Sequence, residues 1–136
     1  MCSSDLNYNF AGAIAAEASL GLLHRVGARE IEQHVRGLAA RLASGLADLG
    51  LPLIGPPSGP TRGSIVCIGK LGDGGHDSTD DADLSALHRV WHDAGVRLSI
   101  RRGLLRLSLH AYNNIDDIDT VLDLTRAWKR TSGSSR

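Results

Sequence analysis

The sequence lacks the marks of several protein classes. Its 136 residues carry 15 basic and 15 acidic side chains, so the formal net charge is zero. Binding to nucleic acid without regard to sequence needs a surplus of positive charge, and this balance disfavours that function. No apolar run is long enough to cross a bilayer, which disfavours a membrane protein. No internal repeat is present, and an average hydrophobic fraction of 42% is typical of a single globular domain.

Cysteine is also scarce. Cys2 and Cys67 are too few for a disulfide framework. Residues 1–5 contain neither the basic residues nor the apolar stretch of a signal peptide. We therefore expect a cytoplasmic protein.

Four segments show the spacing of small or apolar residues that is typical of helices. Gly27 and Gly50 are expected to end the first two helices, Ser78 or Thr79 to cap the third, and Asn114 to cap the last. The segments cover residues 9–26, 31–49, 79–94 and 115–128.

Four other segments are strand candidates: residues 51–54, 64–68, 96–100 and 104–109. The last two flank a turn at residues 101–103 and predict an antiparallel hairpin. The order of the elements predicts an α+β fold, in which helices pack on one face of an antiparallel sheet of three or four strands.

Several residues could belong to a metal site or provide a reactive thiol, but their patterns favour structural or solvent-exposed roles. His88 and His92 share a helix face, but two ligands do not make a zinc site, so we expect a solvated face and no metal. The acidic loop over residues 73–83 lacks the spacing of a calcium site. Cys67 lies in mid-strand and is expected to be an inert core thiol.

The segment from Arg106 to Asn113 is more informative. Arg106, Ser108 and His110 alternate with leucines at 107 and 109, so the polar side chains face away from the core. The segment also resembles the C-terminal signature of the class V aminotransferase-fold enzymes, which use pyridoxal phosphate. That signature reads Arg-x-Ser-x-His-x-Tyr-Asn, and a helix cap like the one at Asn114 follows it.

The resemblance extends over most of the chain, from about Asn7 to Trp128, with a weaker motif at residues 9–14. It implies that residues 7–130 are the C-terminal small domain of a fold type I enzyme, after a helix that joins it to a large domain. On this interpretation the chain is a fragment of roughly the last third of the enzyme. Residues 1–6 are then expected to be a non-native leader, and residues 131–136 a disordered tail.

The resemblance also implies site roles. Arg106 would bind the substrate carboxylate, and Asn7 would reach the cofactor phosphate of the neighbouring subunit in a homodimer. Such enzymes hold pyridoxal phosphate on a lysine of the large domain, and neither Lys70 nor Lys129 has that sequence context. We therefore expect no catalytic residue in this chain and no activity from it alone.

The choice of reaction stays open within the superfamily. Desulfurases carry a nucleophilic cysteine on a loop before the Arg-x-Ser strand, and residues 95–105 contain none. A transaminase-like or epimerase-like enzyme that acts on amino acids is therefore favoured. The alternative is a stand-alone, non-enzymatic α+β domain that binds a ligand or a partner.

Overall fold

The computed structural model describes residues 9–59 and 63–133. The chain divides into two compact units, with the division between Gln33 and His34. The element order is helix, helix, strand, helix, strand, strand, helix. None of the helices described has the length and apolar character needed to traverse a bilayer.

Helix α1 (Phe10–Val26) belongs to the N-terminal unit. The side chain of Asn9 caps it by accepting a hydrogen bond from the backbone N–H of Gly12 at 2.8 Å. None of its residues is buried, and Phe10 and Ile14 are 71% and 68% exposed. Helix α1 thus presents large apolar side chains at its surface, although it also carries Glu17, His24 and Arg25.

Helix α2 (Ala28–Asp48) crosses the boundary between the units. Its C-terminal part has an apolar stripe at helical spacing, and that stripe is the helical side of the core. The buried residues of the stripe are Val35, Leu38, Ala39, Leu42, Ala43 and Leu46.

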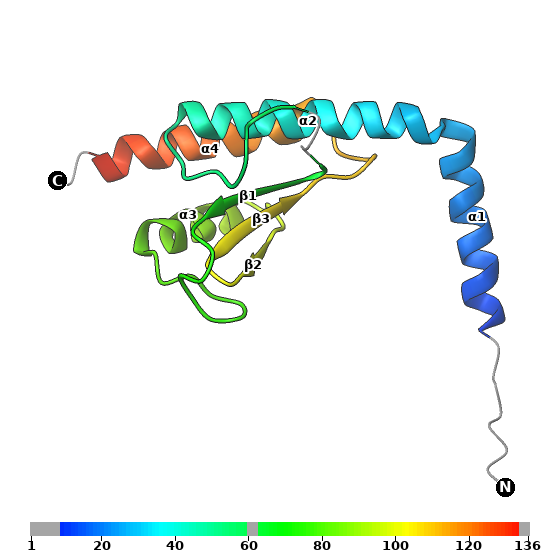
Figure 1. Ribbon diagram of the computed structural model, residues 1–136, viewed down its shortest axis with the longest axis horizontal. Helices are drawn as coiled ribbons and strands as arrows, with labels where there is room; N and C mark the ends of the chain where they lie inside the picture. The colour runs from blue at the N-terminus through cyan, green and yellow to red at the C-terminus, as the bar shows by residue number, and fades with distance from the viewer. Residues whose placement is uncertain (1–8, 60–62, 134–136) are drawn as a thin grey trace, which may run out of the picture. The chain divides into compact units, whose positions relative to one another are not determined.

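The sheet has three antiparallel strands in the order β1 (Ile65–Gly69), β3 (Leu104–Ser108), β2 (Ser99–Arg101). The predicted α+β fold is confirmed, with α2 and α4 (Ile115–Gly133) running along one side of the sheet (Figure 1). Residues 51–54 form only an isolated bridge between Leu53 and Ile68 rather than a fourth strand. The chain turns away immediately afterwards, at Gly55 with φ of 77°.

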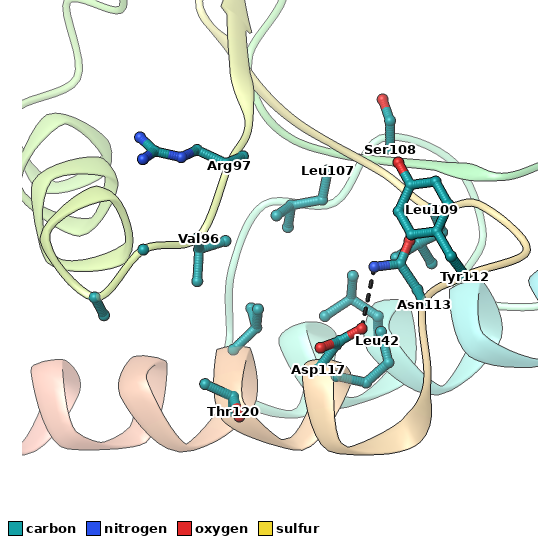
Figure 2. Close-up of a pocket in the computed structure, with 14 residues that line it drawn as sticks. Leu42, Val96, Arg97, Leu107, Ser108, Leu109, Tyr112, Asn113, Asp117 and Thr120 are labelled. Atoms are coloured by element: carbon teal, nitrogen blue, oxygen red, sulfur yellow. Dashed lines mark hydrogen bonds between the residues drawn. The ribbon is translucent and has the colours of Figure 1, made fainter.

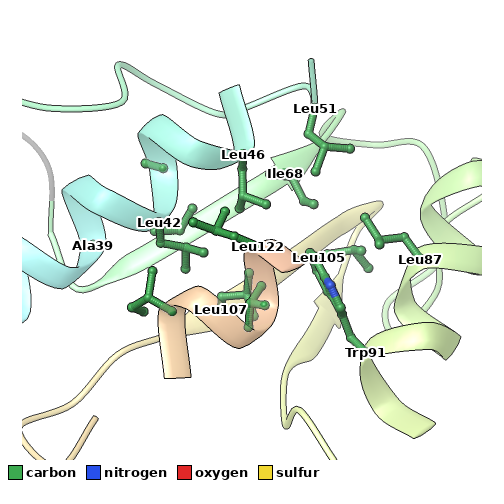
Figure 3. Close-up of a cluster of buried hydrophobic side chains, with 14 of the residues drawn as sticks. Ala39, Leu42, Leu46, Leu51, Ile68, Leu87, Trp91, Leu105, Leu107 and Leu122 are labelled. Atoms are coloured by element: carbon green, nitrogen blue, oxygen red, sulfur yellow. The ribbon is translucent and has the colours of Figure 1, made fainter. Parts of the chain in front are cut away.

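One face of the sheet packs into the core. Leu105 and Leu107 of β3 meet the helical residues Leu42, Leu46 and Leu122 in a single cluster (Figure 3). Trp91, on helix α3 (Ala82–Asp93), is fully buried there. Its indole N–H donates to Thr125 Oγ1 at 3.2 Å, and that hydroxyl donates to the Val121 carbonyl at 2.6 Å. The only polar residue among the buried ones described is therefore satisfied.

Two helix ends differ from the sequence prediction. Asp81 caps α3 in place of Ser78 or Thr79, with its carboxylate accepting from the Leu84 N–H at 3.0 Å. Ser78 instead accepts from the Gly75 N–H within the preceding loop. Helix α4 continues through Thr131, Ser132 and Gly133, where a polar tail was expected. Residues 134–136 and the expected leader at residues 1–6 lie outside the described residues.

Candidate functional site

The second face of the sheet carries Arg106. In the strand register Arg106 is paired with Cys67 on β1 and with Ser99 on β2. Directly paired residues point to the same face, so these three side chains form one row across the sheet. Leu105 and Leu107 point the other way, into the core. The predicted alternation around Arg106 is confirmed, and we call this second face the open face.

Arg106 is half-buried and has no partner of opposite charge within residues 9–59 and 63–133. Among the residues that the structure describes, its side chain takes part in no hydrogen bond or ion pair. A guanidinium without a partner in the protein keeps its donors available for an anion that a ligand supplies. The open face therefore presents a cation that is suited to a carboxylate or phosphate.

The other arginines of the hairpin are placed differently. Arg101 is exposed, and its guanidinium lies 3.3 Å from Nε2 of His76. Arg102 is exposed at the turn, with φ of 49°. Neither lies on the central strand, so Arg106 is the best positioned of the three for binding a ligand.

Strand β3 holds Arg106 rigidly because it is hydrogen-bonded on both sides. The tight turn at Arg102 and Gly103, both with positive φ, sets the register of the β2–β3 hairpin. The loop over residues 70–78 is hydrogen-bonded to this turn, as the Gly72 N–H donates to the Arg102 carbonyl and the Gly103 N–H to the Ser78 carbonyl. The position of Arg106 thus depends on the hairpin turn.

The residues after β3 form a hydrogen-bonded connection to α4. The side chain of Asn113 accepts from the His110 N–H at 2.9 Å and donates to the Asp117 carboxylate at 3.1 Å. The backbone carbonyl oxygen of Asn113 lies 2.8 Å from Nε2 of His34 on α2. His110 lies beyond the end of β3 and stacks on Tyr112, with ring centroids 4.8 Å apart. The motif residues His110, Tyr112 and Asn113 therefore shape this turn.

The predicted cap at Asn114 is confirmed, and Asp117 completes it. The Asn114 side chain accepts from the N–H groups of Asp116 and Asp117, and the Asp117 carboxylate accepts from the Asn114 N–H at 3.0 Å. This reciprocal pattern is a capping box. Hydrogen bonds hold the pKa of Asp117 below its usual range. The bond from the Asn114 backbone N–H has the largest effect, and the bond from the Asn113 side chain has the next largest.

Replacing Asp117 with alanine is expected to lower the free energy of unfolding by about 1 kcal/mol at neutral pH, because two donors lose their acceptor. The pKa of Asp117 is lower in the folded chain than in the unfolded one. Its contribution is therefore present above the unfolded pKa and is lost as the pH falls through the folded pKa. Urea unfolding at pH 7 and in strong acid measures both effects. A difference that is equally large in acid would contradict this role.

A cleft of about 460 Å³ lies beside this connection (Figure 2). Its lining combines apolar residues, such as Leu42, Leu107 and Val121, with the polar residues Arg97, Ser108, Tyr112, Asn113, Asp117 and Thr120. In Figure 2 the Asn113 side chain is directed at Asp117, while the Arg97 guanidinium points away from that carboxylate. Arg106 does not line this cleft, which is therefore distinct from the row on the open face.

The structure places the other residues that the sequence singled out as follows. The rings of His88 and His92 are 6.0 Å apart, and burial, with the charges of His92 and Arg89, keeps the pKa of His88 below its usual range. No group of three or more metal-ligating side chains was found in the described part of the chain. Asn7 lies outside the described residues.

The expectation that Cys67 is a core thiol is wrong. Cys67 is half-buried and its side chain points to the open face beside Arg106, while its neighbours Val66 and Ile68 are buried in the core. The sequence pattern missed this because β1 is apolar on both sides. Ser99 was missed as well, since only the pairing of strands places it next to Arg106.

Comparison with known proteins gives sequence and structural relatives. No protein-family profile matches the chain. A probable cysteine desulfurase from Pyrococcus abyssi (strain GE5 / Orsay) is 27% identical over 133 residues, which are 94% of this chain and 33% of that protein.

Two solved structures cover 90% of the chain. The apo cysteine desulfurase from Thermococcus onnurineus NA1 has a TM-score of 0.73, is 22% identical and is matched over 32% of its length. The serine palmitoyltransferase from Sphingomonas wittichii has a TM-score of 0.61, is 25% identical and is matched over 29%. The chain thus spans about a third of the length of these proteins. The predicted resemblance to the C-terminal part of class V aminotransferase-fold enzymes is confirmed.

Proposed function

We propose that this chain supplies the substrate-binding arginine, Arg106, to a pyridoxal-phosphate-dependent enzyme that acts on amino acids. The observation that carries the proposal is the side chain of the half-buried residue Arg106, which has no partner among the described residues and lies on the open face of the sheet. Arg106 also matches the arginine that binds the substrate carboxylate in the class V aminotransferase-fold family, which supports an amino acid as the substrate. Amino-acid binding and turnover in the longer protein, after single replacement of Arg106, test the proposal.

A guanidinium suits this role because its planar fork meets a carboxylate with two parallel hydrogen bonds. Such a clamp fixes the orientation of the amino acid, and this orientation decides which bond at Cα is broken. The central strand gives the rigidity that the clamp requires.

The residues of this chain do not fit covalent attachment of the cofactor. Lys70 is highly exposed, and its ammonium lies 3.9 Å from the Asp73 carboxylate. Lys129 is on the last helix, α4, remote in sequence from the Arg106 strand. A serine palmitoyltransferase similar to this chain, with a TM-score of 0.53, was solved with pyridoxal phosphate. We propose that the same cofactor, which would act as the electron sink, is held by a lysine outside this chain.

This chain alone is expected to show no covalent binding of pyridoxal phosphate, because neither Lys70 nor Lys129 has the sequence context of the lysine that holds the cofactor in the family. Absorption spectra recorded during titration with the cofactor check this. The matched variant is Lys70→Ala. A new visible absorption band in the wild-type chain that this variant lacks would contradict the expectation.

We further propose a transaminase-like or epimerase-like reaction, although two of the relatives are described as cysteine desulfurases. Residues 95–105 contain no cysteine. Residues 95–98 lead from α3 to β2 (Ser99–Arg101), and a two-residue turn then connects β2 to β3. A hairpin this tight leaves no loop that could deliver a nucleophilic thiol to the substrate. Cys67 lies beside Arg106 in the strand register, but it is held in strand β1 and not on a loop before the Arg106 strand, where the family's nucleophilic cysteine lies.

Three further parts of the proposal follow from the family resemblance. Asn7 would donate a hydrogen bond to the cofactor phosphate of a neighbouring subunit. The enzyme would be a homodimer, and its compartment would be the cytoplasm, since two cysteines suit a reducing environment. In the longer protein, cofactor affinity after Asn7→Ala tests the first of these.

A further inference from the structure

The row that contains Arg106 has three members, one from each strand. Cys67 and Ser99 are its direct cross-strand neighbours, and the Cβ atoms of such pairs are about 5 Å apart on the same face. The side chains of Cys67 and Ser99 make no hydrogen bond within the described residues. A ligand on Arg106 would therefore lie between these two side chains.

We propose that Ser99 and Cys67 are the walls of the carboxylate site at Arg106, with Ser99 as a second hydrogen-bond donor. This inference rests on the proposed function and adds two positioning residues to it. A carboxylate has about four lone-pair sites, and the arginine fork uses two of them. The Ser99 hydroxyl can donate to a third. The Cys67 side chain is small, so it leaves room for the carboxylate.

The thiol of Cys67 also makes the site measurable in this chain without a cofactor. Iodoacetate carries a carboxylate, and iodoacetamide is its neutral analogue of similar size. In both reactions the thiolate attacks the CH₂ carbon, a C–S bond forms, the C–I bond breaks and iodide leaves, while the thiol proton goes to solvent. If the carboxylate binds Arg106, only iodoacetate is directed to Cys67.

The experiment measures the ratio of the two alkylation rates at Cys67 by mass spectrometry, in a Cys2→Ser background. Arg106→Gln is expected to lower the iodoacetate-to-iodoacetamide ratio about fivefold, the effect of one full charge at contact distance in water. Ser99→Ala should lower it about twofold. The matched control is Arg101→Gln, which removes the same charge from the same face at a more distant position and should change the ratio less than twofold.

A second measurement needs no substitution at the site. Sodium acetate in place of sodium chloride, at equal ionic strength, should compete for Arg106 and lower the ratio at least twofold. A ratio that neither acetate nor Arg106→Gln changes would overturn the inference, and an unchanged ratio in Ser99→Ala would overturn the role of Ser99. The two proposals can fail separately. If Arg106→Ala abolishes amino-acid turnover in the longer protein but Arg106→Gln leaves the alkylation ratio unchanged, the roles of Cys67 and Ser99 are wrong and the proposed function is still supported.

Discussion

Replacing Arg106 with alanine in the longer protein is expected to weaken amino-acid binding roughly ten- to a hundredfold. A hydrogen-bonded pair with a charged group contributes about 1.5–3 kcal/mol, which corresponds to this range. The effect on the fold should be small, because Arg106 has no partner among the described residues and its backbone stays in the sheet. The measurements are substrate affinity and kcat/KM, with circular dichroism as a check of folding.

The lysine variant separates geometry from charge. Arg106→Lys keeps the charge but not the planar fork, so it should not restore affinity. Arg101→Ala and Arg102→Ala are the matched controls, since both remove a positive charge from the same hairpin. Each should change affinity less than about threefold, as expected for exposed charges. Intact affinity and turnover in Arg106→Ala would show that the carboxylate is bound elsewhere.

The fold was predictable from local patterns. In these elements the local conformational preference of the residues agrees with the burial of their apolar side chains. Examples are the apolar stripes of α2 and α4, the alternation in β3 and the turn at Arg102 and Gly103. The cap of α3 was misplaced because Ser78, Thr79 and Asp81 are all good caps. The choice among them depends on the preceding loop, in which Ser78 is already bonded to Gly75.

The site was only partly predictable. The motif and the alternation identified Arg106, whereas the residues beside it are set by pairing between strands that are distant in sequence. Cys67 precedes Arg106 by a whole helix, and its orientation follows from a register that no local pattern specifies. Similarly, the contact from His34 to Asn113 joins residues 79 positions apart. Such relations come from tertiary packing rather than from propensity.

Substituting Gly103 with alanine is expected to lower the free energy of unfolding by about 2–5 kcal/mol. Gly103 has φ of 86°, where a side chain costs about 1–2 kcal/mol. A Cβ at this position would also lie 2.6 Å from the backbone carbonyl oxygens of both Asp73 and Lys70. Backbone atoms cannot rotate away as a side chain can, so the loop or the turn has to move, which typically costs a further 1–3 kcal/mol.

The neighbouring turn residue supplies the matched control. Arg102 also has positive φ, at 49°. Arg102→Gly relieves backbone strain in the folded state, but it also raises the conformational entropy of the unfolded state, so the two effects oppose each other. We expect its stability to stay within about 1 kcal/mol of the wild type. Urea unfolding of both variants measures the difference. Because the turn sets the pairing of Ser99 with Arg106, Gly103→Ala should also lower the alkylation ratio at Cys67. Equal stability of the two variants would show that the turn does not fix the register of the Arg106 strand.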